Sequence, residues 1–321
     1  MIGNRSAARI GGRILLFAFW LGPLLGLLGP RNDGNAESFV LWELRAPRVV
    51  AGLLVGGTLG LAGAVTQALF RNPLATPSTT GSLAGATVGA LLALVCGASA
   101  GSFGLPAIAL SAFAGAMLTS SLVLFASASG RIRTQDILLI GIAVTLAATS
   151  GATIVEDLAD TPALVAASRW SLGHLGQVGF GQARVVAPVF VVCWIVQLTQ
   201  IRALQTMVLG EELAHSRGLS VRRVRLISLG ACSLSVATAV AWCGPIAFVG
   251  LIIPALVRLS LGASQRVVLP VSLVTGAAFL SLCDALGRLM TARHEIPVGV
   301  VTAALGAPAL VALVTVRNRQ T

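Results

Sequence analysis

Long apolar stretches recur along this whole sequence and decide what it can fold into. A helix needs about 20 consecutive apolar residues to cross the hydrocarbon core of a bilayer. Stretches near that length lie at residues 12–29, 47–70, 81–97, 104–128, 136–156, 183–201, 226–243, 244–260, 268–290 and 296–316. The mean hydropathy of +0.91 lies outside the range of soluble domains. The sequence therefore predicts an all-α, polytopic membrane protein with about ten transmembrane helices.

The segments between these stretches are short; the longest are about residues 31–46, 157–182 and 202–225. None is long enough to fold separately, so we expect residues 1–321 to form a single transmembrane domain.

The first apolar stretch follows Arg5, Arg9 and Arg13, as the apolar region of a cleaved signal peptide does. Its continuation lacks a convincing small-residue cleavage site. We therefore expect this stretch to be retained as the first helix.

Arginine supplies all the fixed basic charge, because the 22 Lys and Arg residues include no lysine; the formal net charge is +11. The arginines lie in short loops and not on one soluble face, so binding of nucleic acid is not expected. With both termini in the cytoplasm, most arginines face inward, as the positive-inside rule requires. A chain without lysine also cannot form a standard Walker A nucleotide site.

Residues that could bind metals or carry protons are scattered. The five cysteines sit singly in predicted spans, where we expect buried free thiols, and the three histidines are equally dispersed, so no metal or haem site is predicted. Of the acids near membrane depth, Asp136 and Glu156 fall at span ends. Asp284 has Arg288 four residues later, a spacing that predicts an ion pair on one helix face. Without a chain of acids across the bilayer, a proton-coupled carrier is disfavoured.

Glycines recur every four residues at Gly52, Gly56 and Gly60, and again at Gly81, Gly85 and Gly89. This spacing lets membrane helices approach backbone to backbone, so it predicts a tightly packed bundle. Two reversals that contain proline, "RNPLATP" (71–77) and "CGPIAFVGLIIP" (243–254), occupy loosely corresponding places in the two halves of the chain. That correspondence is a weak indication of an inverted repeat.

The densest run of charge lies in mid-chain, in a segment at about 207–225 that includes "GEELAHSRGLSVRRVR" (210–225). Glu211 and Glu212 are placed to begin a short helix, and Gly218 to end it. Arg222, Arg223 and Arg225 could merely enforce topology. A topology signal needs neither the two glutamates nor a helix with glycine at both ends, so we expect a short cytoplasmic helix with a function of its own.

Four stretches carry a family resemblance: "LRAPRVVAGLLVGGTLGLAGAVTQALFRNPLATP" (44–77), "GEELAHSRGLSVRRVRL" (210–226), "GPIAFVGLIIPALVRLSLG" (244–262) and "EIPVGVVTAALGAPALVALV" (295–314). In this order they resemble the permease subunit of the ABC importers for iron-siderophore, haem and cobalamin. The resemblance implies a permease homodimer in the bacterial inner membrane. It also implies two copies of a separate ATPase, which bind ATP and Mg, and a substrate-binding protein outside, with no cofactor on this chain and no catalysis by it.

The resemblance also implies roles for particular residues. The helix that docks on the ATPase corresponds to Gly210, Glu211, Glu212, Ala214, Arg217 and Gly218. The cytoplasmic gate corresponds to Asn72, Leu74 and Thr134. Docking of the binding protein corresponds to Arg45, Arg48 and Arg288; the alternative is that Arg288 neutralises Asp284 while Arg45 and Arg48 reach lipid phosphates.

Two stretches depart from the family pattern. Members often have P-H-x-x-R where this chain has Pro254 to Arg258 without the histidine, and "RWSLGHLGQ" (169–177) replaces a frequent W-x-x-G-S-L. A ferric siderophore is the expected substrate, with haem or cobalamin as the alternative. A secondary carrier without an ATPase is the rival class. A membrane-embedded enzyme is disfavoured because no nucleophile, metal-ligand set or carboxylate pair is clustered.

Overall fold

The computed structural model describes residues 12–14, 16–27, 40–97, 104–128, 132, 134–176, 179–290 and 295–318, and within them every regular element is helical. The elements are α2 (Leu21–Leu27), the π-helical turn η1 (Val40–Arg45), α4 (Ala46–Phe70), the 3-10 turn η2 (Pro77–Thr80), α5 (Ser82–Val95), α6 (Gly104–Ala128), α7 (Thr134–Asp157), α8 (Thr161–Ser171), α9 (Phe180–Thr199), α10 (Ile201–Val208), α11 (Glu211–Ser216), α12 (Val221–Cys243), α13 (Val249–Leu261), α14 (Gln265–Leu289) and α15 (Val298–Asn318). Arg5, Arg9, Arg131, Arg133, His294 and Arg319 lie outside the described residues.

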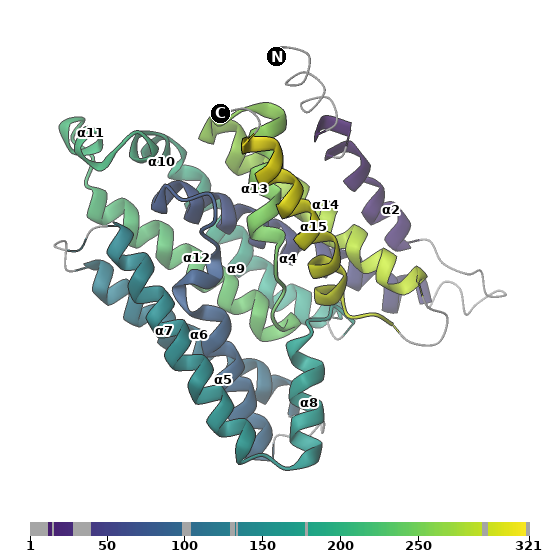
Figure 1. Cartoon of the computed structure of the whole chain (residues 1–321). Coiled ribbons are helices and arrows are strands. Elements are labelled where there is room, and N and C mark those ends of the chain that lie inside the picture. The colour runs from purple at the N-terminus through teal and green to yellow at the C-terminus, as the bar shows by residue number, and fades with distance from the viewer. Residues whose placement is uncertain are drawn as a thin grey trace. The chain divides into compact units, whose positions relative to one another are not determined.

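Each of the ten predicted apolar stretches contains a helix (Figure 1). In the described part of the chain, six helices are long and apolar enough to cross a membrane: Val40–Phe70, which joins η1 to α4, and the main parts of α6, α7, α9, α12 and α14. Shorter apolar helices at Gly12–Leu27, α5 and α13, and the apolar part of α15 at Val298–Leu313, account for the other four stretches. The prediction of an all-α, multi-pass membrane fold is confirmed.

The predicted span 244–260 begins too early. The helix α13 starts only at Val249, because Gly244 (φ 71°) and Phe248 (φ 68°) hold the backbone outside the right-handed helical region. The first reversal behaves in the same way, since Arg71 has a φ of 50° and α5 starts only at Ser82. At 14 and 13 residues, α5 and α13 are each about 20 Å long and do not match the thickness of a bilayer alone.

The two halves of the chain repeat one pattern. A long helix, a reversal, a short helix and two long helices occur in α4 to α7 and again in α12 to α15. The short helix packs on the two that follow it in both halves: α5 on α6 and α7, and α13 on α14 and α15. The shared order and packing agree with the repeat that the two reversals suggest.

Contacts divide the chain into two compact units. Unit 1 comprises Met1–Ala64, His174–Val191 and Ile246–Thr321, and in it α14 packs on α2, α13 and α15. Unit 2 comprises Val65–Gly173 and Val192–Pro245, and in it α5, α6 and α7 lie side by side (Figure 1). Because α4 and α9 contribute residues to both units, the division does not follow a boundary in the sequence. The single membrane domain stays a prediction.

Glycines allow close helix contacts inside each unit. In unit 1 an added Cβ on Gly56 would collide with the carbonyl oxygen of Gly276 in α14. In unit 2 a Cβ on Gly89 would collide with the carbonyl of Ser111 in α6. The predicted backbone-to-backbone packing is thus present. Gly81 has another role, because its φ of 79° ends η2 and starts α5.

Two features were not foreseen. The helix α8 lies in a segment with no predicted helix, and its start is capped by the side chain of Asp160, which accepts a 3.0 Å hydrogen bond from the amide of Ala163. The sequence signal was Asp160 followed by Thr161 and Pro162, a cap with proline in the first turn. The expectation that every cysteine is buried is wrong for Cys96, which is exposed at the end of α5.

Candidate coupling, gating and docking sites

The charged mid-chain segment folds as predicted into a short helix, α11, with glycine at both ends. Gly210 precedes it with a φ of 135°, and Gly218 follows it with a φ of 76°. The amide of Gly218 donates to the carbonyl of His215 (2.9 Å), and the amide of Leu219 donates to that of Ala214 (3.0 Å). This pair of bonds is a Schellman motif, which needs a left-handed residue at the position of Gly218. Glycine at both positions therefore fixes the length of the helix.

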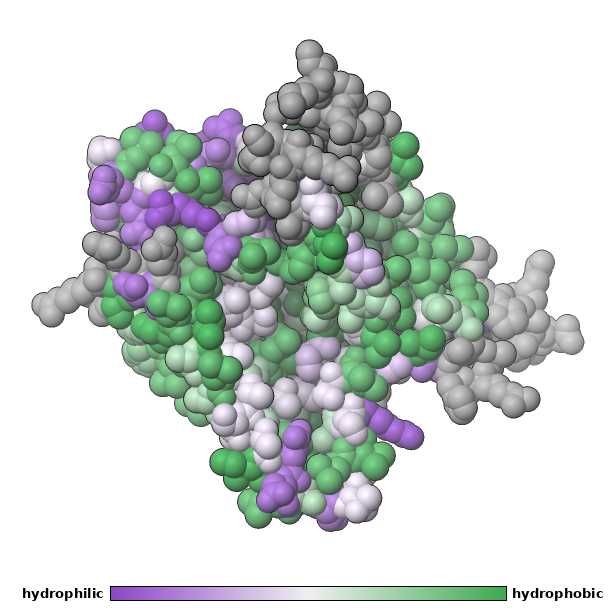
Figure 2. Space-filling model, viewed as in Figure 1, coloured by the Kyte–Doolittle hydropathy of each residue, from purple (hydrophilic) through white to green (hydrophobic). Residues whose placement is uncertain are grey.

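One face of α11 is packed and the other is open. Ala214 is fully buried, whereas Glu212 and Arg217 are exposed. Leu209 just before the helix is 61% exposed and Leu213 within it is 37% exposed. Figure 2 shows hydrophilic residues gathered over α10 and α11, with apolar surface among them. The open face thus mixes charge with uncovered apolar side chains.

Glu211 is engaged inside unit 2. Its Oε1 accepts a 3.1 Å hydrogen bond from Nη2 of Arg225, near the start of α12. Nη1 of the same guanidinium donates to the carbonyl of Ile132 at 3.2 Å. Arg225 is almost completely buried. One arginine therefore joins α11, α12 and the chain just before α7.

Two of the residues expected at the gate, Asn72 and Leu74, lie in a hydrogen-bonded reversal between α4 and α5. Oδ1 of Asn72 accepts a 2.9 Å bond from the amide of Leu74, and the carbonyl of Asn72 accepts one from Ala75 at 3.1 Å. Leu74 itself is 58% exposed. The side-chain bond is an Asx turn, which presents Leu74 outward on a fixed backbone.

Thr134 is the first residue of α7, and its helix packs against the same reversal. Two turns later, a Cβ on Gly141 would collide with the carbonyl of Thr79 in η2. The hydroxyl of Thr119 in α6 donates to the carbonyl of Gly81 at 3.0 Å. The reversal and the start of α7 therefore belong to one packed part of unit 2.

In unit 1, two of the three arginines expected to dock the binding protein share one carboxylate. Oδ1 of Asp284 accepts a 2.9 Å bond from Nε of Arg48, and Oδ2 lies 3.3 Å from Nε of Arg288. The predicted ion pair between Asp284 and Arg288 is thus confirmed. Nη1 of Arg48 also donates to Oε2 of Glu295 at 2.6 Å, and Nη2 of Arg288 donates to the carbonyl of Gly26 at 2.9 Å.

Burial separates the members of this charge cluster. Asp284 is 3% exposed and Glu295 is 63% exposed, while Arg48 and Arg288 are mostly buried. Arg45 lies outside the cluster, half-buried, with Nη1 3.5 Å from the carbonyl of Leu27.

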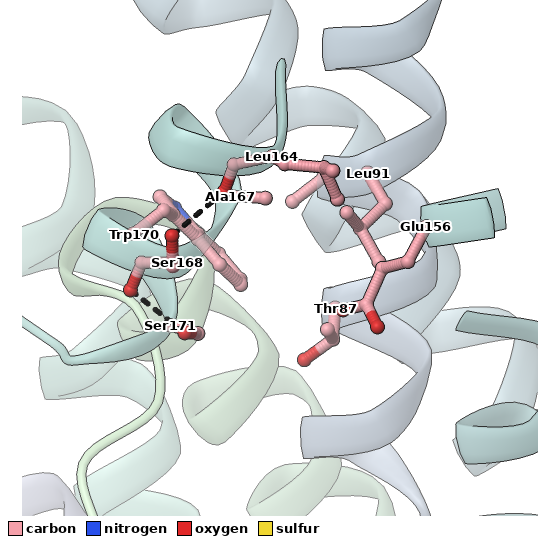
Figure 3. A pocket seen from close by; sticks show the side chains of 9 residues that line it. Thr87, Leu91, Glu156, Leu164, Ala167, Ser168, Trp170 and Ser171 are labelled. Atoms are coloured by element: carbon pink, nitrogen blue, oxygen red, sulfur yellow. Dashed lines mark hydrogen bonds between the residues drawn. The ribbon is translucent and has the colours of Figure 1, made fainter. Parts of the chain in front are cut away.

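A pocket of about 300 Å³ opens in unit 2 between α5, α7 and α8 (Figure 3). Glu156 and Thr87 line one side and Trp170, Ser168 and Ser171 the other. The hydroxyls of Ser168 and Ser171 donate to carbonyls of their own helix. Glu156 is exposed at the rim of this pocket, so it does not belong to a buried proton relay.

Sequence reasoning missed three members of these sites. Arg225 was placed in the coupling segment at about 207–225 with no contact of its own assigned, yet its position in the second turn of α12 places it inside the packed face. Glu295 and Ile132 carried no signal, because their partners are 247 and 93 residues away in the sequence.

Comparison with known proteins identifies the family of the chain. The sequence model of the FecCD transport family matches residues 13–316. The chain is 38% identical to the cobalamin import system permease protein BtuC of Halobacterium salinarum, over 90% of this chain and 77% of that one. It is 33% identical to the hemin transport system permease protein HmuU of Yersinia pestis, over 89% and 86%.

A solved structure has the same fold over nearly the whole chain. It is described as an inward-facing conformation of a metal-chelate type ABC transporter, with a TM-score of 0.84, 27% identity, and coverage of 97% of this chain and 99% of that one. The chain therefore belongs to the FecCD transport family and is a multi-pass membrane permease of the ABC importer type.

Proposed function

We propose that this chain is the permease subunit of an ATP-driven importer in the inner membrane, through which a metal chelate passes from a substrate-binding protein to the cytoplasm. The observation that carries the proposal is the family match from residue 13 to 316 on a chain that also forms α11. The chain performs no chemistry itself. ATP and Mg bind to two copies of a partner ATPase.

The ATPase docks on α11. Leu209 and Leu213 are uncovered on a segment that the charge pattern assigns to the cytoplasm. Exposed apolar side chains rimmed by charged ones are typical of protein contacts. Glu212 and Arg217 supply the charged rim, and the two glycines hold the helix at a length that a cleft can receive.

A second copy of the chain completes the pathway. Only 17% of the most apolar part of α7 is buried within the described chain, the lowest share among the six long helices. Its uncovered surface includes the hydroxyls of Thr149, Ser150 and Thr153 among apolar residues. Each hydroxyl donates to a carbonyl one turn earlier, so it tolerates an apolar neighbour and can still accept a hydrogen bond from a solute. We assign this face to the dimer contact and the pathway.

Asn72, Leu74 and Thr134 form the cytoplasmic end of that pathway. Non-helical backbone at membrane depth survives where protein or a water-filled cavity satisfies it. The hydrogen bonds of the 71–81 reversal meet this condition, and Leu74 projects from it.

Arg45 receives an acidic residue of the binding protein on the outer face. We assign the same docking role to Arg48 and Arg288, which are bonded to Asp284. Glu295 is the exposed acid next to Arg48. A guanidinium grips a carboxylate through two parallel hydrogen bonds, which gives such a contact its orientation.

The substrate is a compact metal chelate. The relatives described above are named for cobalamin and hemin, which favours these two, and a ferric siderophore is the expectation from the sequence. Three chemically distinct chelates thus form the arms of one transport test.

The test uses the purified chain in proteoliposomes with its cognate ATPase inside and its binding protein outside. Uptake of labelled cyanocobalamin, hemin or a ferric hydroxamate siderophore is measured with ATP, without ATP and without the ATPase. The proposal requires that one chelate accumulates only when ATP and the ATPase are both present. Equal uptake without the ATPase would instead identify a secondary carrier.

The gate is tested with a cysteine at Leu74 after Cys96, the exposed native cysteine, is replaced by serine. Crosslinking between two copies should occur in one nucleotide state and fall in the other. A cysteine at Leu158, which follows the last residue of α7 and is 74% exposed, is the matched control. Crosslinking at residue 74 that ignores nucleotide would remove the gate from this position.

A further inference from the structure

The guanidinium of Arg225 is the point where the expected coupling helix meets the expected gate. It belongs to α12, it binds Glu211 at the first residue of α11, and it binds the carbonyl of Ile132 two residues before Thr134. All three segments lie in unit 2, where α11 packs on α12 (Figure 1). In the sequence, Thr134 and the first residue of α11 are more than 70 residues apart.

The chemistry of the junction suits a rigid link. A buried arginine costs free energy unless its charge is paired and its donors are bonded. Here Nη2 meets a carboxylate and Nη1 meets a carbonyl, 3.1 and 3.2 Å away. Because a guanidinium is planar, moving one partner reorients the donor offered to the other. A flexible ammonium group would keep the charge but would transmit such a movement less well.

We propose that Arg225 is a positioning residue that transmits movement of α11 to the chain before α7, and so couples ATP hydrolysis to opening of the gate. This inference rests on the proposed function, because it assumes that α11 docks on an ATPase. Arg222 and Arg223 precede Arg225 in the same helix, but both are exposed. Arg222 and Arg223 therefore contribute to the positive charge of the cytoplasmic side, whereas Arg225 makes the contacts of the junction.

The test compares uptake per ATP hydrolysed in the reconstituted importer for wild type, Arg225→Gln, Glu211→Gln and the double variant, with Arg223→Gln as the matched control. Arg225→Gln should lower this ratio at least about fivefold, while the ATPase still co-purifies and hydrolyses ATP. Glu211→Gln should lower it in the same direction. If both residues act through one junction, the ratio of the double variant should be no lower than that of the more defective single variant.

A second readout separates coupling from folding. Arg225→Lys keeps the charge without the fork, so its ratio should lie between those of wild type and Arg225→Gln, with wild-type membrane levels. If Arg225→Gln does not accumulate, Arg225→Lys and Glu211→Gln carry the test. Unchanged ratios in these variants, or losses that multiply in the double variant, would overturn the junction. Wild-type protein that shows no ATP-dependent uptake would instead refute the proposed function.

Discussion

Asp284 in α14 accepts a 2.9 Å hydrogen bond from Arg48 in α4, a residue 236 positions earlier in the chain, and the carboxylate is 3% exposed. The same carboxylate pairs with Arg288 one turn later. This cluster connects helices that are distant in sequence, and it also gives one of the sharpest tests of the structure.

Asp284→Asn should destabilise the protein. The change leaves two mostly buried guanidinium groups without their shared counter-charge. We expect a loss of about 2 kcal/mol, seen as a lower melting temperature of the detergent-purified chain. Glu295→Gln is the control, because an exposed partner contributes less than about 1 kcal/mol. Equal melting temperatures for Asp284→Asn and wild type would show that the charge cluster does not stabilise the fold.

Arg45→Glu should weaken association with the binding protein about tenfold without changing the melting temperature. Arg45 is half-buried and does not bond Asp284, so charge reversal there removes the proposed docking cation and leaves the bonds of Asp284 to Arg48 and Arg288 in place. The loss should shrink at high salt, because exposed charges are screened. Titration of purified binding protein at two salt concentrations measures it; wild-type affinity at both would leave Arg45 with a role in lipid contact only.

Gly56→Ala and Gly230→Ala should have opposite effects, although both replace a helical glycine. A Cβ at residue 56 collides with the carbonyl of Gly276, whereas a Cβ at residue 230 meets no atom within 4 Å. The first should reduce stability through displaced backbone. The second should gain up to about 1 kcal/mol, because alanine favours the helix. Thermal unfolding of both variants measures this contrast, and similar values would contradict the close packing of α4 and α14.

Gly218→Val should loosen α11 and weaken the hold of the ATPase. A β-branched residue at a φ of 76° costs about 1–2 kcal/mol, which opposes the Schellman cap. Co-purification of the ATPase with the tagged permease should fall severalfold while membrane level is kept. Ser216→Ala, at an exposed position in the same helix, should retain wild-type co-purification. Full retention by Gly218→Val would separate the cap from docking.

The local features of this protein were predictable because each depends on neighbouring residues. The length of the apolar stretches predicted a helix in each of the ten. The i,i+4 spacing predicted the ion pair of Asp284 and Arg288, and the glycines at 210 and 218 predicted the ends of α11. The start of α13 was misplaced because apolar composition does not reveal a backbone that turns at Gly244 and Phe248. Hydropathy indicates whether a residue prefers an apolar environment, and it carries no information on the backbone angle φ.

The tertiary structure alone decided which charges meet. Arg48 and Glu295 are 247 residues apart, and Arg225 and Ile132 are 93 apart, so no periodicity along the chain relates them. Arg48 and Glu295 are brought together by the folding of unit 1, and Arg225 and Ile132 by the folding of unit 2. The sequence by itself determined a membrane permease with a short, glycine-bounded helix. Only packing determined which arginine joins that helix to the rest, since burial makes a charge seek whatever partner the fold brings within hydrogen-bonding distance.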